Sequence, residues 1–235
     1  MENTQEQKAT FRQKIENYWY HYKFHTIAGA FILFVIIWGL VTAIGRTGED
    51  VSIGYIGEHL YTQAEAETVC GKMSASIDMD LDGNGKSDIV LVQYQHYTDE
   101  QIRRLATEAE ERGREFAYYP DLNSNNYLKF ENDLATGNTA VWMVSKEVYE
   151  KMDKSVLLTV EEVLGYVPDK GVVDEYAIDC IHLPLCCEAA AALSVNSYLV
   201  IRGAREYSFI PGNDKMAQEF ENSKALYKAI VEYKK

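Results

Sequence analysis

Residues 26–44 read TIAGAFILFVIIWGLVTAI, nineteen residues without a charged side chain. At about 1.5 Å per residue, a helix of this length spans roughly 28 Å, close to the hydrocarbon thickness of a bilayer. The stretch predicts a transmembrane helix that divides the chain. Residues 1–25 precede it, residues 45–50 form a short polar linker, and residues 51–235 are long enough for one α/β domain.

The distribution of charge predicts the orientation of this helix. Residues 1–46 carry five Lys or Arg and three acidic residues, a net charge of +2, and the whole chain carries −13, which leaves −15 for the remainder. The positive-inside rule places the N-terminus in the cytoplasm and residues 51–235 outside the cell membrane. A surface this acidic disfavours nucleic acid as a partner.

A cleaved signal peptide is the alternative interpretation of the apolar stretch. Residues 41–43, VTA, resemble a small-x-small cleavage site. Signal peptides usually have an apolar region of about 7 to 15 residues, and this run is longer, which favours an uncleaved, single-pass signal anchor.

Aromatic residues are concentrated before the apolar stretch. Phe11, Ile15, Tyr18, Trp19 and Tyr22 recur at helical spacing, which predicts an amphipathic helix at the cytoplasmic surface of the membrane. Two roles are open for these side chains: anchoring in the headgroup layer, or contact with a partner membrane protein.

Beyond the linker, strand-like and helix-like patterns alternate. Capping boxes at Thr62, Thr98 and Thr159 predict helix starts, and Ile102, Leu105, Ala106 and Ala109 would form the inner face of the second of these helices. A looser stretch with Pro120 and the Asn-rich residues 123–126 should precede a further helix containing Tyr127, Phe130 and Leu134. The runs that predict strands are 51–57, 89–95, 139–144, 172–180 and 198–202. This order predicts an α/β domain with a mostly parallel, doubly wound sheet.

Residues 80–88, DLDGNGKSD, form the most specific motif in the chain. Oxygen ligands at alternate loop positions and a glycine for the sharp turn are the arrangement by which a short loop surrounds Ca²⁺. The loop leads into a strand, and position 12 is Leu91 instead of the Glu of an EF-hand. The sequence predicts a structural calcium site, with an ion-free turn as the alternative. The predicted ligands are Asp80, Asp82, Asn84, Lys86 through its carbonyl, and Asp88.

The cysteines and histidines point to no catalytic or zinc centre. Cys70 falls on the inner face of a predicted helix and is expected to be a buried apolar residue, while Cys180 is spaced to bridge either Cys186 or Cys187 outside the membrane. The chain lacks the hydrolase, P-loop, zincin and dinucleotide-binding motifs. His59, His96 and His182 are scattered and are expected at the surface or at caps. We therefore predict a non-enzymatic protein.

Several stretches resemble uncharacterised membrane-anchored proteins of clostridial Gram-positive bacteria. They are residues 16–26 (ENYWYHYKFHT), 50–57 (DVSIGYIG), 82–85 (DGNG) and 134–138 (LATGN). Residues 130–164 are also similar to extracellular solute-binding proteins, in which a helix ending in a glycine turn leads to a strand and a short helix. The resemblance implies a single solute-binding-like lobe outside the membrane.

These observations predict a membrane-tethered binding domain for a small-molecule ligand or a partner protein. Open parallel sheets bind ligands at the carboxyl ends of their strands. The candidate residues at that edge are Gly57, Glu58, His59, Tyr97 and Ser145. The alternative prediction is a structural or regulatory subunit of a membrane complex that uses the aromatic N-terminal helix as its contact surface.

Overall fold

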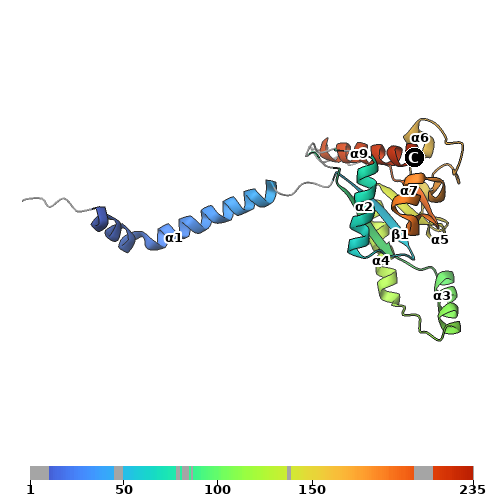
Figure 1. Cartoon of the computed structure of the whole chain (residues 1–235), viewed down its shortest axis with the longest axis horizontal. Helices are drawn as coiled ribbons and strands as arrows, with labels where there is room; N and C mark the ends of the chain where they lie inside the picture. The colour runs from blue at the N-terminus through green and yellow to red at the C-terminus, as the bar shows by residue number, and fades with distance from the viewer. Residues whose placement is uncertain are drawn as a thin grey trace, which may run out of the picture. The chain divides into compact units, whose positions relative to one another are not determined.

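The computed structural model describes residues 11–44, 50–77, 80, 85, 87–136, 139–203 and 214–234. The chain divides into two compact units, Met1–Thr47 and Gly48–Lys235. The first unit is helical and the second is a mixed α/β domain, as Figure 1 shows.

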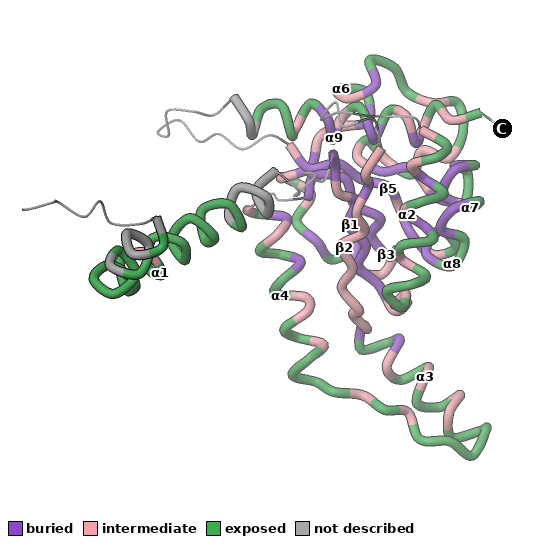
Figure 2. Tube along the Cα trace, turned by 60° about the vertical axis from the view of Figure 1, so that its left-hand side comes forward, coloured by how far each residue is buried: buried purple, intermediate pink, exposed green. Residues whose placement is uncertain are grey.

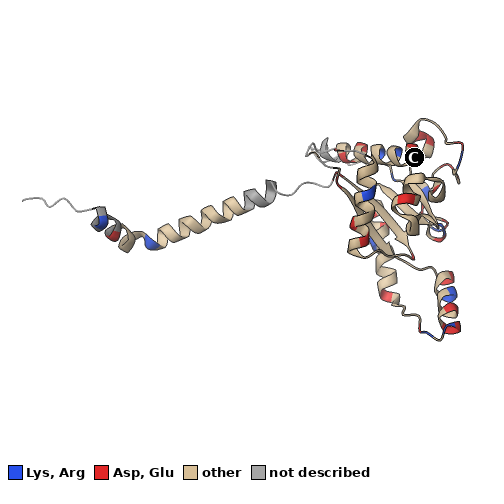
Figure 3. Ribbon diagram, viewed as in Figure 1, with Lys and Arg blue, Asp and Glu red and all other residues tan. Residues whose placement is uncertain are grey.

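One helix, α1 (Phe11–Ile44), runs without a break through the aromatic segment and the apolar stretch. Its section Tyr18–Trp38 is long and apolar enough to cross a membrane, a property that anchors share with signal sequences. Charged residues end at Lys23, and the helix beyond it is uncharged (Figure 3). The Thr26 hydroxyl donates to the Tyr22 carbonyl at 3.0 Å, so this polar group is satisfied within the helix.

The second unit is built on one five-stranded sheet with the strand order β2-β1-β3-β5-β4. Strands β2 and β3 both pair parallel with β1, whereas β5 pairs antiparallel with β3 and with β4. Strand β5 therefore runs opposite to the other four, and the predicted mostly parallel α/β sheet is confirmed. The strands are β1 (Val51–Gly57), β2 (Ile89–Gln95), β3 (Val141–Ser145), β4 (Ile178–Asp179) and β5 (Ser197–Ile201).

The predicted capping boxes are present at three helix starts. At Thr98, the Gln101 amide donates to the threonine hydroxyl at 3.4 Å and the Gln101 side chain accepts from the Thr98 amide at 2.8 Å. Thr159 and Thr62 make the same reciprocal bonds. The helices of this unit are α2 (Gln63–Ile77), α3 (Asp99–Glu111), α4 (Pro120–Thr136), α5 (Lys146–Tyr149), α6 (Val160–Leu164), α7 (Pro184–Ala189), α8 (Ala191–Ser194) and α9 (Asp214–Glu232).

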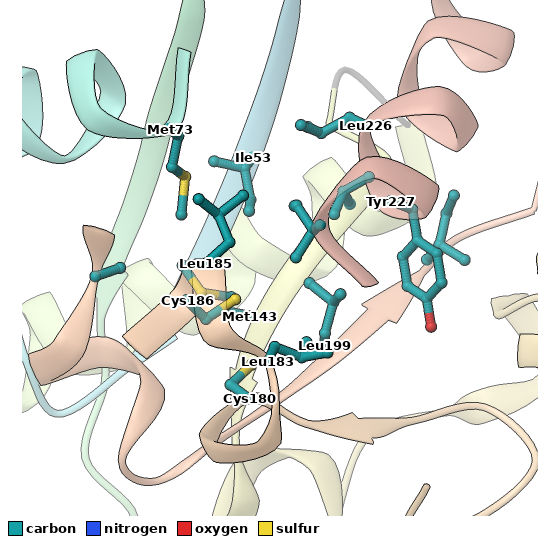
Figure 4. Packing of buried hydrophobic residues seen from close by; sticks show 14 of the residues in the cluster. Ile53, Met73, Met143, Cys180, Leu183, Leu185, Cys186, Leu199, Leu226 and Tyr227 are labelled. Atoms are coloured by element: carbon teal, nitrogen blue, oxygen red, sulfur yellow. The ribbon is translucent and has the colours of Figure 1, made fainter. Parts of the chain in front are cut away.

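Helices cover both faces of the sheet, each over its own apolar core. Figure 4 shows the first core, in which Ile53, Met143 and Leu199 of the sheet meet side chains from α2, α7 and α9. On the opposite face, Trp142 and Val144 pack against α4 and α5. Buried residues follow these strands in Figure 2, so alternating residues of each strand supply the two cores.

The region around α3 and α4 differs from the prediction. Helix α4 begins at Pro120 and includes the Asn-rich stretch. Proline suits the first turn of a helix, because the backbone N–H that it lacks would have no partner within the helix there. The expected inner face of α3 is not buried: Ala106 is exposed, and Ile102, Leu105 and Ala109 are half-buried. Figures 1 and 2 show the reason, since α3 and the start of α4 extend away from the sheet. Residues 99–122 are called the α3–α4 arm.

The fourth predicted strand is shorter than expected. Within residues 172–180, only Ile178 and Asp179 pair with β5, and Val172 makes an isolated bridge to Ile178. A turn interrupts the rest, because the Asp174 side chain accepts the Tyr176 amide at 3.0 Å. A local side-chain bond of this kind competes with extended pairing.

Candidate functional site

A cavity of about 300 Å³ lies at the edge of the sheet where the parallel strands β1, β2 and β3 end. Tyr55 of β1, Glu58 and His59 after β1, Tyr97 after β2, and Ser145 at the end of β3 line this cavity. This is the carboxyl edge, at which open α/β sheets bind ligands. Four of the five candidate edge residues are thus brought together around one cavity.

The remaining wall comes from residues that were not predicted to belong to the site. Leu105 and Phe116 of the α3–α4 arm form one side, and Ala192, Leu193 and Asn196 form another. The cavity therefore combines the sheet edge with two segments that are remote from it in sequence.

Gly57, the fifth candidate, lies directly behind the cavity wall. A Cβ atom at this position would overlap the Tyr55 hydroxyl and would lie 3.0 Å from Cβ of Ser145. Because only a hydrogen fits here, the end of β1 can approach the end of β3 closely. Gly57 shapes the cavity without lining it.

The Tyr55 phenol is buried and points toward the turn after β1. Its oxygen accepts the backbone amide of His59 at 3.3 Å. Burial raises the pKa of Tyr55 well above its usual value; the His59 amide lowers it, and the carboxylates of Glu58 and Glu147 raise it further. Tyr55 is therefore protonated at neutral pH and can donate its hydrogen.

Ser145 holds the most informative polar atom of the cavity. The residue is 2% exposed, and its hydroxyl has no hydrogen-bond partner within the described part of the chain. The residue precedes α5 in the N-cap position, where serine usually caps, but its side chain makes no capping bond. Buried polar groups are almost always paired, so an unpaired hydroxyl in a residue that lines a cavity indicates a place for a ligand or for water.

Two aromatic rings form a corner of the cavity. The rings of Tyr97 and Phe116 lie edge to face, with centroids 5.8 Å apart and planes at 86°. Asn123 fixes the backbone of Tyr97 from α4: its side-chain oxygen accepts the Tyr97 amide at 2.8 Å and its nitrogen donates to the Tyr97 carbonyl at 2.9 Å. Gln95 donates to the Tyr97 hydroxyl at 2.7 Å. The corner is therefore held in place on the Tyr97 side.

Two carboxylates contribute to the electrostatics of the cavity. Glu58 is a lining residue, and Arg104 of α3 forms an ion pair with it at 2.6 Å between Nη2 and Oε2. Both carboxylate oxygens of Glu147 in α5 accept hydrogen bonds from the side-chain nitrogen of Asn196, at 2.8 and 2.9 Å. Because the side-chain nitrogen of Asn196 is engaged in these bonds, its side-chain oxygen is the atom that can accept a hydrogen bond from a ligand.

The predicted calcium loop lies at the amino end of β2, the opposite edge of the sheet from the cavity. Asp82, Asn84 and Lys86 fall outside the described residues. Gly85 adopts a positive φ of 83° and donates its amide to Asp80 Oδ2 at 2.9 Å.

The predicted ligand Asp88 is held at the start of β2 by backbone bonds. Its amide donates to Asp50 Oδ2 at 2.7 Å, and its carbonyl accepts the Asp50 amide at 3.0 Å. Among the described residues, no group of three or more His, Cys, Asp or Glu is placed to hold a metal ion.

The cysteines form part of the packing around α7. All four are free thiols; Cys180 and Cys186 are buried in the first core, and Cys187 donates to the Ile181 carbonyl at 3.3 Å. Cys70 on α2 is half-buried where the helical pattern predicted full burial.

His96 serves a packing role. Its ring lies 4.8 Å from that of Tyr127, and Nδ1 is 3.3 Å from the Asn123 carbonyl. This half-buried packing position differs from the surface or capping position expected for it.

No protein-family model, curated protein or solved structure matches this chain. The fold and the site define a mixed α/β domain with an N-terminal apolar helix and a cavity at the carboxyl edge of its sheet.

Proposed function

We propose that the protein is a membrane-tethered, non-enzymatic binding domain that holds a small ligand in the cavity at the carboxyl edge of the sheet. The observation that carries this proposal is the Ser145 hydroxyl, which is buried and unpartnered among the described residues, in a residue that lines the cavity. Leaving such a group unpaired costs about 1–3 kcal/mol. A ligand that bonds to Ser145 recovers this energy.

The proposal includes the location of the domain. In this arrangement α1 is an uncleaved signal anchor in the cell membrane, the N-terminus is cytoplasmic, and residues 51–235 are extracytoplasmic. The supporting observations are the basic residues that precede the apolar section of α1 and the acidic remainder of the chain. Ligands outside the membrane would then reach the cavity directly.

A thermal-shift experiment with a metabolite panel tests ligand binding. The full-length chain in detergent is heated with each compound, and a compound that binds the native state raises the melting temperature by mass action. Stabilisation by at least one compound is expected. Failure of every compound would argue against the proposal and in favour of a subunit role.

Replacement of Ser145 by alanine should separate stability from binding. We expect Ser145→Ala to leave the free energy of unfolding unchanged or to raise it by up to about 1 kcal/mol, because no bond is lost and a buried polar atom is removed. Binding of the stabilising compound should weaken.

Ser194 supplies the matched control for this experiment. It is also 2% exposed, but its hydroxyl donates to the Ala191 carbonyl at 3.0 Å. Ser194→Ala should therefore lower stability by about 1 kcal/mol and leave binding intact. Equal losses of stability in the two variants would contradict an unpartnered Ser145.

We also propose that residues 80–88 bind a structural Ca²⁺ through Asp80, Asp82, Asn84, the Lys86 carbonyl and Asp88. Extracellular loops of this type bind with dissociation constants of about 10⁻⁴ to 10⁻³ M. Addition of EGTA should lower the melting temperature, and excess CaCl₂ should restore it. If neither EGTA nor the Asp82→Ala substitution changes the melting temperature, residues 80–88 do not bind a structural Ca²⁺.

A second candidate function is that of a subunit of a membrane complex. The exposed aromatic side chains of α1 favour it, because Tyr18, Trp19, Tyr20 and Tyr22 are each more than half exposed. Specific co-purification of a membrane protein with the full chain, lost when these residues are replaced by leucine, would support this role.

A further inference from the structure

Two polar groups of the cavity wall act only as acceptors, whereas the Tyr55, Tyr97 and Ser145 hydroxyls can both donate and accept. The side-chain nitrogen of Asn196 is committed to Glu147, so the amide presents its oxygen. Glu58 adds a carboxylate, and Ser145 adds a hydroxyl that can accept. Because the hydroxyls can adapt to either role, the acceptor-only groups Glu58 and Asn196 favour a ligand that carries several N–H donors.

The aromatic corner adds a second kind of attraction for the same ligand. The faces of aromatic rings are electron-rich, and a cation within about 6 Å of a ring centroid is attracted to them. Tyr97 and Phe116 lie edge to face against each other and both line the cavity, so together they offer an aromatic surface to its occupant.

Fixed charges favour a cation over an anion. Among the described residues that line the cavity, Glu58 is acidic and none is Lys or Arg. Arg104 lies outside the lining and pairs with Glu58 at 2.6 Å, so it offsets part of the Glu58 charge without facing the ligand. An anionic ligand would face Glu58, with Glu147 close behind Asn196.

From these three features we infer that the cavity binds a small organic cation whose head group is a protonated primary amine. The ammonium donates to Glu58 and to the Asn196 side-chain oxygen, and it lies against the aromatic corner. A volume of about 300 Å³ is at the lower end for ligand pockets, which limits the occupant to a small molecule. This inference rests on the proposed ligand-binding role of the cavity.

Three probes of equal chain length test the charge of the head group. Saturation-transfer NMR is recorded on the full-length chain in nanodiscs with n-butylamine, 1-butanol and butyrate at neutral pH. We expect n-butylamine to bind at least about fivefold more tightly than 1-butanol, and butyrate to bind most weakly.

Two acidic residues that share Arg104 provide a matched pair of variants. Glu58→Gln should weaken n-butylamine binding by about fivefold or more. Glu108→Gln should leave it unchanged, because Glu108 contacts the same arginine at 3.8 Å without lining the cavity. Phe116→Leu keeps an apolar wall and removes the ring, so it should weaken n-butylamine binding more than 1-butanol binding.

The outcomes distinguish this inference from the proposed function. Equal or tighter binding of 1-butanol or butyrate would overturn the choice of a cation and leave the cavity as a ligand site. If no probe binds, the cation is also overturned, and the metabolite panel then decides whether the cavity binds any ligand. Equal effects of Glu58→Gln and Glu108→Gln would overturn the assignment of the ammonium to Glu58.

Discussion

Replacing Trp142 with alanine is expected to lower the free energy of unfolding by about 3–5 kcal/mol. The indole is fully buried in β3, with the ring of Phe130 at 5.1 Å and that of Tyr94 at 6.2 Å. Its Nε1 donates to the Thr139 carbonyl at 2.8 Å. The alanine variant would therefore lose packing on two aromatic rings and leave this carbonyl without its indole donor.

The neighbouring strand has no side chain to refill the space. Gly54 pairs with Trp142 in the parallel register of β1 and β3, and a Cβ atom at Gly54 would overlap the indole. The cost of a large-to-small substitution depends on how far the surroundings can collapse. With glycine as the neighbour, we expect a loss near the upper end of the range.

Urea unfolding of the full chain, followed by far-UV circular dichroism, measures this effect. Tyr119→Ala is the control, because Tyr119 is a large aromatic residue that is 68% exposed. The control should change the free energy of unfolding by less than about 0.5 kcal/mol. A similarly small change for Trp142→Ala would contradict the burial of the indole between β1 and α4.

The elements that were predicted correctly are those with a strong local signal. The first two strands coincide with their apolar, β-branched runs, and the capping boxes at Thr98 and Thr159 define the starts of α3 and α6. In each case the deciding interactions lie within a few residues of one another. The parallel sheet then follows from the alternation of strands and helices.

The features that were missed depend on long-range pairing. Strand β5 begins at Ser197 and pairs antiparallel with β3, with Ser145 opposite Ser197. This register places Asn196 beside the end of β3, and no local pattern specifies which strand β5 joins. Similarly, the apolar spacing of α3 indicates a helix but does not show that the helix projects from the sheet.

Only the part of the candidate site that lies at the sheet edge could be predicted from the sequence. Glu58, His59, Tyr97 and Ser145 follow or end predicted strands, so the rule of the carboxyl edge was sufficient to select them. Phe116 lies in the irregular segment after α3, where periodicity carries no information about position. Its contribution to the cavity follows from the tertiary contact of its ring with Tyr97.

Substitution of Gly57 by alanine is expected to disrupt the cavity more completely than any change to a lining residue. The added methyl group would overlap the Tyr55 hydroxyl and press on Ser145. Tyr55 is 3% exposed and packs in the first core, so its ring can give way only toward the cavity, which it would then narrow. Overpacking of this kind costs about 1–3 kcal/mol in stability.

Ligand binding by Gly57→Ala should weaken by about tenfold or more, which corresponds to about 1.4 kcal/mol, because Tyr55 and Ser145 would both be displaced. Binding is measured with the compound that stabilises the unchanged chain, and stability is measured by urea unfolding. Gly71→Ala is the control, since a Cβ atom at this exposed position in α2 meets no described atom within 4 Å. It should raise stability by about 0.5–1 kcal/mol and leave binding unchanged. If Gly57→Ala binds the compound normally, the ligand does not occupy the space between the ends of β1 and β3, and the cavity is not the binding site.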